Sequence, residues 1–186
     1  MAAYVQVGSI VNCFSAVDVS GVGSAGSLLG YVFDTDITNC YATGDVNGSY
    51  ANFGGNAGHT STGRITNCYA TGSISGSQGD CGLVGLAAGG VGPSTITNCA
   101  ALNPSVGTGR VSLDYYAVSY SNNIAWDGMT VDGVTATNGT ASNYNGTDIT
   151  TAQTKQKSTY EDLGWDFTAD WKIEEGVSYP KLKWEE

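Results

Sequence analysis

The chain has 186 residues, of which 41% are hydrophobic and only 13% charged, and its formal net charge at pH 7 is −10. This composition excludes a disordered chain, and the 27 glycines, together with abundant Asn and Thr, favour strands and turns over helices. The acidic balance excludes a nucleic-acid-binding surface, which needs Lys and Arg to neutralise phosphates. It equally argues against an anionic membrane as partner.

The N-terminus carries no recognisable targeting segment. Residues 1–7 do not resemble a signal peptide, and no apolar run approaches the roughly 20 residues that a membrane span needs. The first repeat begins by residue 9, without the capping segment that solenoid ends normally carry. We therefore expect a trimmed segment of a longer protein, with any export signal lost upstream and no membrane insertion of this part.

A unit built on Ile-x-Asn-Cys-(Tyr/Phe) recurs along the chain. Successive cysteines of the unit are 27, 28 and 31 residues apart, from 13 to 40, 40 to 68 and 68 to 99. A fifth, degenerate copy is Tyr120–Trp126. The four clear copies are Ser9–Ser15, Asp36–Ala42, Arg64–Ala70 and Thr95–Ala101.

A period of this size fits one coil of a parallel β-helix with three short strands and three turns. We therefore predict an all-β fold: a right-handed parallel β-helix, or β-solenoid, of about four to five coils with an aromatic-rich C-terminal cap. The predicted division is residues 1–126 for the solenoid repeats and residues 127–186 for the capping segment.

Equivalent residues of successive coils should stack in columns about 4.8 Å apart. Three aliphatic columns are expected inside, an Asn column should form an amide ladder at a turn, and the repeat glycines should supply positive φ angles at corners. The aliphatic columns are Ile10, Ile37, Ile65 and Ile96; Val19, Val46 and Ile74; and Leu28 with Leu83. The Asn column is Asn12, Asn39, Asn67 and Asn98, and the glycines are Gly21, Gly48, Gly76 and Gly107.

Cysteine forms a further column. Disulfides between adjacent coils are geometrically conceivable, but small thiols also fill a narrow interior, and reduced core cysteine is the reading we prefer. The spacing lacks the short C-x-x-C pairing of zinc sites, so no metal is expected. Cys81 stands where the repeat has Gly, and we assign it no role. The column residues are Cys13, Cys40, Cys68 and Cys99.

Aromatic residues follow the cysteines, and alternation places Phe14, Tyr41 and Tyr69 on the outer face. Stacked outer rings can be sheet packing or a platform for sugar rings. Three of the four Trp residues lie after residue 160, in a segment that ends Tyr179-Pro-Lys-Leu-Lys-Trp. We expect these aromatic residues to plug the open end of the solenoid; the alternative is a sugar-binding site.

Catalytic motifs are absent from the sequence, and its single histidine, His59, lies in a Gly-rich run. Asp18 and Asp45 each follow a repeat Asn by six residues, so they should stack on adjacent coils. Such a carboxylate pair could serve a retaining glycosidase, although Ser73 takes this position in the third coil. Asp34 and Asp36 could help to bind Ca²⁺, and a single Thr column is too little for an ice-binding face.

The pattern Ile-Thr-Asn-Cys-Tyr-Ala-Thr-Gly-x-(Val/Ile)-x-Gly, followed by Gly-Leu-Val-Gly, resembles the GLUG-motif repeat family. The closest matches are residues 37–48 and 65–85, and the repeats together span about residues 8–109. The resemblance implies an exported, cell-surface, β-helical module of bacterial proteins, including adhesins and the non-catalytic part of IgA-specific metalloproteases of streptococci. It implies no catalytic residues.

We therefore expect a non-catalytic extracellular module of a bacterial surface protein, with an adhesin-like binding or spacer role and no cofactor. Its partners would be host or bacterial surface glycans or proteins. The alternative is a carbohydrate-active β-helix enzyme or its carbohydrate-binding accessory domain. The candidate ligand-binding residues are Tyr41, Tyr69, Asp18 and Asp45.

Overall fold

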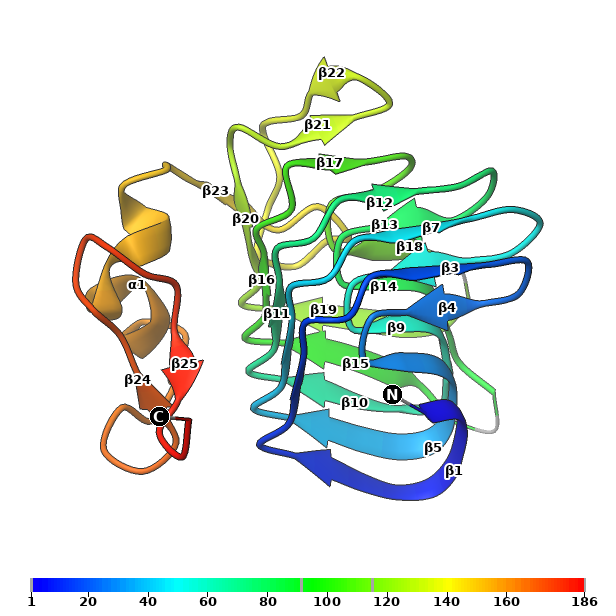
Figure 1. Cartoon of the computed structure of the whole chain (residues 1–186), viewed down its shortest axis with the longest axis horizontal. Helices are drawn as coiled ribbons and strands as arrows, with labels where there is room; N and C mark the ends of the chain where they lie inside the picture. The colour runs from blue at the N-terminus through cyan, green and yellow to red at the C-terminus, as the bar shows by residue number, and fades with distance from the viewer. Residues whose placement is uncertain (1, 91, 115, 186) are drawn as a thin grey trace.

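The computed structural model describes residues 2–90, 92–114 and 116–185. The chain winds into a stack of parallel β-coils, and its last residues lie alongside the stack (Figure 1). The predicted all-β parallel solenoid is confirmed.

Sheet A is the longest wall of the solenoid and has five parallel rungs within the described residues. From the third rung on, each rung is two short strands in line rather than one long strand. The rungs are β1 (Ala2–Val11), β5 (Leu29–Thr38), β9 (Ala57–Ser61) with β10 (Gly63–Thr66), β14 (Val84–Ala88) with β15 (Ser94–Thr97), and β18 (Ser112–Asp114) with β19 (Val118–Ser121).

Sheet B forms the second wall, and smaller sheets close the coil. Sheet B contains β2 (Phe14–Ser15), β6 (Tyr41–Ala42), β11 (Tyr69–Ala70), β16 (Ala100–Ala101), β20 (Ile124–Trp126) and β23 (Thr147–Ile149). The remaining coil strands are β3 (Val19–Gly21), β7 (Val46–Gly48) and β12 (Ile74–Ser75); β4 (Ala25–Gly26), β8 (Phe53–Gly54) and β13 (Asp80–Cys81); and β17 (Ser105–Val106), β21 (Thr130–Val131) and β22 (Val134–Thr135).

The repeat asparagine makes the corner between sheets A and B. Its backbone is left-handed in every coil, with φ of 52° at Asn39, 54° at Asn67 and 56° at Asn98, a conformation that Asn tolerates better than most residues. The side chains bond between coils, Asn67 Nδ2 donating to Asn39 Oδ1 at 3.1 Å and Asn122 Nδ2 to Asn98 Oδ1 at 3.0 Å. The predicted amide ladder is therefore confirmed between Asn39 and Asn67 and extends from Asn98 to Asn122, whereas Asn12 Nδ2 donates to Asp170 Oδ1 instead.

The predicted reason for glycine at the repeat positions, a positive φ angle, is wrong. Gly21, Gly48, Gly76 and Gly107 do not have a positive φ. A Cβ at Gly48 would instead lie 2.3 Å from the carbonyl oxygen of Gly21 and 2.4 Å from the Phe53 ring. Close packing, rather than corner geometry, therefore excludes a side chain at Gly48, whereas a Cβ at Gly21 would meet nothing within 4 Å.

The degenerate fifth unit is a genuine coil. Tyr120 pairs with Ile96 in sheet A, and Ile124 pairs with Ala100 in sheet B. Asn123 takes the cysteine position, fully buried, and its side chain bonds Cys99 N at 2.9 Å and Ile96 O at 2.8 Å. Strand β23 continues sheet B as far as Ile149. The division of the chain at residue 126 stays a prediction.

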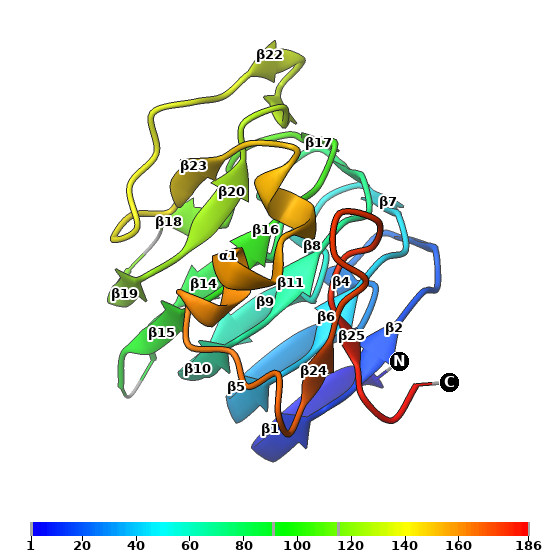
Figure 2. The same ribbon diagram turned by 90° about the vertical axis from the view of Figure 1, so that its left-hand side faces the viewer.

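The aromatic C-terminal segment packs along the flank of sheet B (Figures 1 and 2). It contains the short helices η1 (Gln153–Lys155) and α1 (Lys157–Glu161) and the antiparallel pair β24 (Trp171–Lys172) and β25 (Lys181–Leu182). The aromatic-rich C-terminal cap is thus confirmed, but the prediction that it plugs the open end of the solenoid is wrong. It covers the side of the stack, because outward Tyr, Ala and Ile side chains of sheet B offer it an apolar surface. The buried residues of this second core are Tyr41, Tyr69, Ala100, Leu102, Ile124, Ile149, Tyr160, Leu163, Trp165, Trp171 and Leu182.

A different segment, residues 136–146, covers the C-terminal end of the solenoid core. The carbonyl oxygen of Tyr144 accepts the N–H of Val111 at 2.9 Å. Arg110, only 1% exposed, donates to the carbonyls of Ala136, Asn145 and Gly146 at 2.5, 2.9 and 3.0 Å. Its guanidinium also lies 2.6 Å from Asp148 Oδ1. A buried cation therefore fastens the covering loop.

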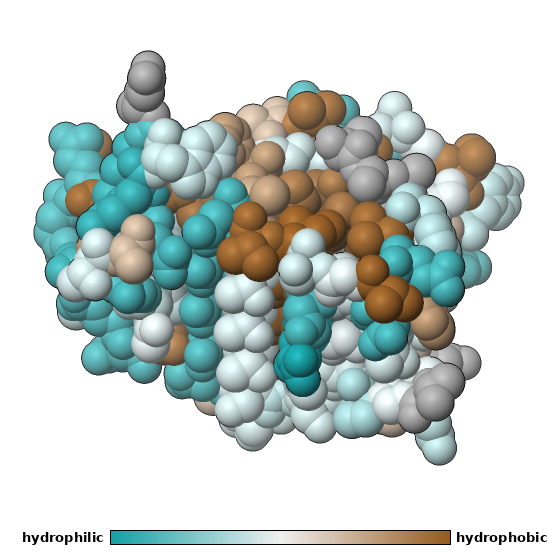
Figure 3. All heavy atoms as spheres, turned by 90° about the horizontal axis from the view of Figure 1, so that it is seen from below, coloured by the Kyte–Doolittle hydropathy of each residue, from teal (hydrophilic) through white to brown (hydrophobic). Residues whose placement is uncertain are grey.

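The N-terminal end of the stack is open in comparison. Strand β1 is the first rung of sheet A, and Val7 and Val11 of this strand are 66% and 49% exposed. Figure 3 views the molecule from the β1 side, where apolar side chains gather at the centre of the face.

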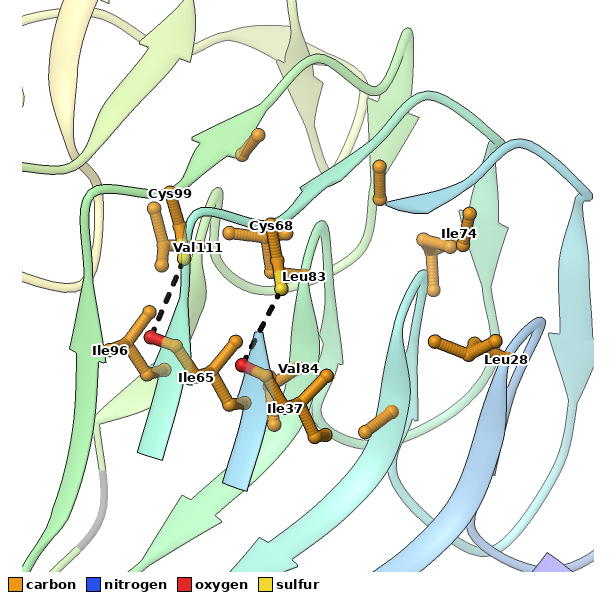
Figure 4. Close-up of a cluster of buried hydrophobic side chains, with 14 of the residues drawn as sticks. Leu28, Ile37, Ile65, Cys68, Ile74, Leu83, Val84, Ile96, Cys99 and Val111 are labelled. Atoms are coloured by element: carbon orange, nitrogen blue, oxygen red, sulfur yellow. Dashed lines mark hydrogen bonds between the residues drawn. The ribbon is translucent and has the colours of Figure 1, made fainter. Parts of the chain in front are cut away.

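Aliphatic and thiol side chains fill the interior (Figure 4). Cys40, Cys68 and Cys99 are completely buried, and all five cysteines are free, as the reduced-core interpretation predicted. Each buried thiol of the column donates to carbonyls of its own and the preceding coil, as Cys68 does to Thr66 O at 3.2 Å and Ile37 O at 3.7 Å. Burial raises the pKa of Cys68 and Cys81.

Replacing the buried Arg110 should release the loop of residues 136–146 from the C-terminal end of the core. We expect Arg110→Ala to lower the free energy of unfolding by about 3–5 kcal/mol, because three carbonyls and Asp148 lose their partner. Arg64→Ala is the matched control, since Arg64 pairs with Asp36 on the surface, with its side chain 69% exposed, and should cost less than about 1 kcal/mol. Urea denaturation measures both. Equal losses for the two variants would contradict the role given to Arg110.

The thiols should differ sharply in reactivity. In the folded protein only Cys13, which is half-buried at the open end, should react quickly with a disulfide-exchange reagent, because the other thiols are buried. After unfolding, all five should react. Rapid native labelling of the Cys13→Ser variant, or fewer than five free thiols in the unfolded wild type, would contradict the reduced-core column.

Candidate functional site

The two candidate carboxylates do stack on adjacent coils, as the spacing predicted. Asp18 Oδ1 accepts the backbone N–H of Asp45 at 2.9 Å, and Asp45 Oδ1 accepts the N–H of Ser73 at 2.7 Å. Each carboxylate thus caps a backbone donor of the following coil. This bond gives both residues a structural task, and their role in ligand binding stays a prediction.

The acid with the most raised pKa lies elsewhere. Asp80, in β13, is 3% exposed, and burial raises its pKa to about 6, an effect that the nearby Gly76 N–H partly offsets. Its Oδ1 has no hydrogen-bond partner among the described residues. Ideal Cβ atoms at Gly76 and Gly107 would lie 2.7 and 2.8 Å from its carboxylate oxygens, so both glycines make room for this side chain. Asp80 is almost completely enclosed by the coil.

His59, in the Gly-rich run of the sequence, lies in strand β9. Its ring contacts the Tyr31 ring with 4.5 Å between centroids. Burial lowers its pKa. Among the described residues there is no cluster of three or more His, Cys, Asp or Glu side chains that could hold a metal ion.

A groove of about 390 Å³ lies between the outer face of sheet B and the C-terminal segment. Both candidate tyrosines contribute to it, one rung apart. Its sheet wall contains Phe14, Ala16, Tyr41, Thr43 and Tyr69, and its other wall contains Lys155, Val177, Ser178, Tyr179, Lys181 and Glu185. We call this the flank groove.

The aromatic rings of the sheet wall stack on one another. The centroids of Phe14 and Tyr41 are 5.0 Å apart with ring planes 8° from parallel, and those of Tyr41 and Tyr69 are 4.8 Å apart at 5°. Tyr41 therefore has a ring on each face, and a ligand could reach only its edge. Phe14 is the last ring of the sheet column and is 39% exposed, with the Trp184 ring tilted against it at 5.6 Å between centroids, whereas Tyr41 and Tyr69 are 5% and 2% exposed. The accessible ring surface of the platform is thus at Phe14.

The tyrosine hydroxyls hold the C-terminal segment in place. Tyr41 Oη donates to Glu185 Oε2 and Tyr69 Oη donates to Pro180 O, both at 2.6 Å. Burial, together with the Glu185 carboxylate, raises the pKa of Tyr41, and burial raises that of Tyr69. Both hydroxyls therefore stay protonated as donors. The prediction that these tyrosines bind a ligand remains open, while their packing role is visible.

The wall formed by the C-terminal segment was missed from the sequence. Lys155 places its ammonium 5.9 Å from the centroid of the Tyr179 ring, a cation–π distance. Neither Lys155 nor Lys181 has a carboxylate partner within salt-bridge distance among the described residues. The sequence did indicate a basic C-terminal segment, because five of the seven Lys and Arg residues of this acidic chain fall between residues 155 and 183. The groove thus combines an apolar sheet wall with the ammonium groups of Lys155 and Lys181.

Comparisons with known proteins agree with this architecture. A family model described as the GLUG motif matches residues 21–47, which confirms the resemblance seen in the sequence. A crystal structure from Bacteroides ovatus, described as a "putative immunoglobulin A1 protease", has a similar fold, with a TM-score of 0.73 and 25% sequence identity. The match covers 96% of this chain and 58% of that chain, so this chain spans little more than half of its length. No curated protein matches.

The buried acid gives a test of stability against pH. The folded-state pKa of Asp80, about 6, exceeds its ordinary value of 3.8, so the fold favours the neutral acid. The stabilising contribution of Asp80 to the free energy of unfolding is therefore fully present below about pH 4 and is lost as pH rises through about 6. Asp80→Asn should stabilise the protein at pH 7 by roughly 1–3 kcal/mol and have little effect at pH 4. Urea denaturation at the two pH values measures this, and an equal effect at both would contradict it.

Proposed function

We propose that this chain is a non-catalytic binding module of an extracellular bacterial surface protein, with the flank groove as its ligand site. The groove itself carries the proposal, because an apolar floor with a few polar groups at the rim is the usual form of a binding site. The GLUG motif at residues 21–47 supports the assignment to a surface protein. Among the described residues, no helix is long and apolar enough to cross a membrane.

The groove favours an anionic sugar as ligand. Phe14 and Tyr179 offer apolar ring surface to the carbon-bound hydrogens of a pyranose, and Lys155 and Lys181 offer charge to a carboxylate or sulfate. Glu185 lines the same groove and keeps its negative charge while its carboxylate accepts the Tyr41 hydroxyl and the N–H of Leu182, so the two lysine ammonium groups must outweigh it. The proposed partners are therefore acidic glycans of host or bacterial surfaces.

The alternative is a carbohydrate-active enzyme that uses Asp18 and Asp45, or its accessory domain. The stacking of the two carboxylates supports it, whereas their engagement with backbone N–H groups opposes it. The Bacteroides ovatus protein is described as a protease, but that description applies to a whole chain of which this one covers 58%. Cleavage of an acidic polysaccharide that disappears with Asp45→Asn would favour the enzyme.

A glycan array that includes carboxylated and sulfated sugars tests the binding proposal. We expect binding that weakens at least about tenfold in Phe14→Ala and in the double variant Lys155→Ala with Lys181→Ala, since one charge-assisted contact is worth about 1.5–3 kcal/mol. Lys157→Ala is the matched control, because Lys157 pairs with Glu161 and does not line the groove.

Two outcomes would contradict the proposal. Binding that survives the groove variants and the control equally would place the ligand elsewhere. The absence of any bound glycan at high protein concentration would favour a spacer role. Circular dichroism and thermal unfolding of each variant separate lost binding from lost folding.

A further inference from the structure

The flank groove continues past Lys155 along the C-terminal segment. Lys155 also lines a second hollow, of about 510 Å³, together with Thr151, Gln156 and Glu175. Gln156 in turn lines a third hollow, of about 260 Å³, between sheet B and helix α1. Because neighbouring hollows share a lining residue, the three form one open track that passes Gln156, the residue between η1 and α1. We call the third the α1 hollow.

The α1 hollow combines an apolar floor with polar groups at its rim. Its floor contains Ile124, Ile149 and Leu163, whose side chains are at most 7% exposed. Four polar side chains of the rim make no hydrogen bond to other described residues. They are Gln156, Ser158, Thr159 and Asp162. Their amide, hydroxyl and carboxylate groups are therefore available to a ligand that carries hydroxyls.

A further acceptor of the α1 hollow is held in place by the amide ladder. Asn122 lines the hollow and is the last asparagine of the ladder, and its Nδ2 donates to Asn98 Oδ1 at 3.0 Å. No described residue donates to Asn122 Oδ1. The ladder bond and the left-handed backbone, with φ of 54°, fix this amide. A ligand that binds its oxygen therefore orders no side chain that was free before.

Charge is divided along the track. The flank groove contains the ammonium groups of Lys155 and Lys181. Beyond Lys155, the charged side chains that line the track are Glu175 and Asp162. Glu175 keeps its negative charge while it accepts the N–H of Lys157 at 3.1 Å. An acidic group is therefore attracted at the flank groove and repelled at the α1 hollow.

The hollow on the other side of the flank groove offers fewer available polar groups. It measures about 290 Å³ and shares Ser178 and Lys181 with the groove. The Lys172 ammonium there already donates to the carbonyl oxygen of Glu185, and the Ser178 hydroxyl accepts the N–H of Glu174. A ligand that extends beyond the flank groove thus finds more unpartnered groups on the side of α1.

We propose that the ligand of the flank groove is an oligosaccharide with one acidic residue at its end and neutral residues behind it, one of which binds in the α1 hollow. This inference rests on the proposed function of the flank groove and adds the length and the charge pattern of the ligand. Asn122 Oδ1 and the Asp162 carboxylate accept hydroxyl hydrogens of the neutral residue, and the Gln156 amide donates to its oxygens. Ile124 and Leu163 pack against its apolar face.

Isothermal titration calorimetry with two matched pairs of sugars tests the proposal. The pairs are N-acetylneuraminic acid with sialyllactose, and glucuronic acid with glucuronosyl-xylobiose. In at least one pair, we expect the oligosaccharide to bind at least about tenfold more tightly than its acidic residue alone, because a few added hydrogen bonds together reach that factor. Hexagalacturonate, which is acidic throughout, should not gain this factor over galacturonic acid.

Variants of the α1 hollow locate the gain. The ratio of the two affinities should fall at least about threefold in Asn122→Gly and in Gln156→Ala, because each variant removes a partner of the neutral residue. Glycine tolerates the left-handed backbone at residue 122. Asn138→Gly is the matched control, because Asn138 is exposed, has a left-handed backbone with φ of 67° and does not line the hollow. This control should keep the full ratio.

Several results would overturn the proposal. Equal affinities within both pairs, with binding still lost in the double variant of Lys155 and Lys181, would confine the ligand to the flank groove and leave the proposed function standing. A gain that Asn122→Gly and Gln156→Ala retain as fully as Asn138→Gly does would place the neutral residues elsewhere, and an equal gain for hexagalacturonate would contradict the charge pattern. If no acidic sugar binds at all, the proposed function and this inference fail together.

Circular dichroism shows whether each variant is folded. The Gln156 side chain makes no hydrogen bond to other described residues, so Gln156→Ala decides the test even where the loss of the ladder bond unfolds Asn122→Gly.

Discussion

The left-handed asparagine corner is the constraint on which the stack depends. Asn39, Asn67 and Asn98 turn the chain from sheet A to sheet B with nearly the same φ, so each coil repeats the path of the one before it. Their amides also bond between coils, which fixes the register at the corner. Because the side-chain period of a strand is two, a register error there would turn the Ile column outward and the Thr column inward. The identity of the columns thus follows from one turn.

The corner also explains why two cores exist. The residue after Asn is the inward cysteine, and the next is the outward aromatic, so Cys68 enters the solenoid while Tyr69 leaves it. The thiols are small enough for the narrow interior. The outward rings stack at 4.8–5.0 Å and need a cover of their own. The C-terminal segment supplies that cover, and the flank groove is the part of the seam between cover and sheet that remains open.

Most of the repeat could be predicted from the sequence because its information is periodic. The Ile, Val and Asn columns, the outward rings and the degenerate fifth coil all follow from spacing alone. The position of the cover did not follow, because contacts such as that between Tyr69 and Pro180 occur once and link residues 111 positions apart. Arg110 was missed for a related reason: its partners are backbone carbonyls, which carry no signature in the sequence. The same holds for the groove, whose sheet wall is periodic and was partly predicted, whereas Lys155 and Lys181 are not.

The cover also bonds the asparagine column in two distant coils. Trp165 Nε1 donates to Asn98 O at 2.8 Å, and Trp184 Nε1 donates to Asn12 O at 3.1 Å. In an ordinary repeat array each unit contacts only its neighbours, so terminal units can fray independently. Here the C-terminal segment links the first coil to the fourth. Detachment of this segment would therefore destabilise all the coils between them. This link through the C-terminal segment joins the coils into one cooperative folding unit. It also slows folding, because a contact across 172 residues must wait until nearly the whole chain is in place.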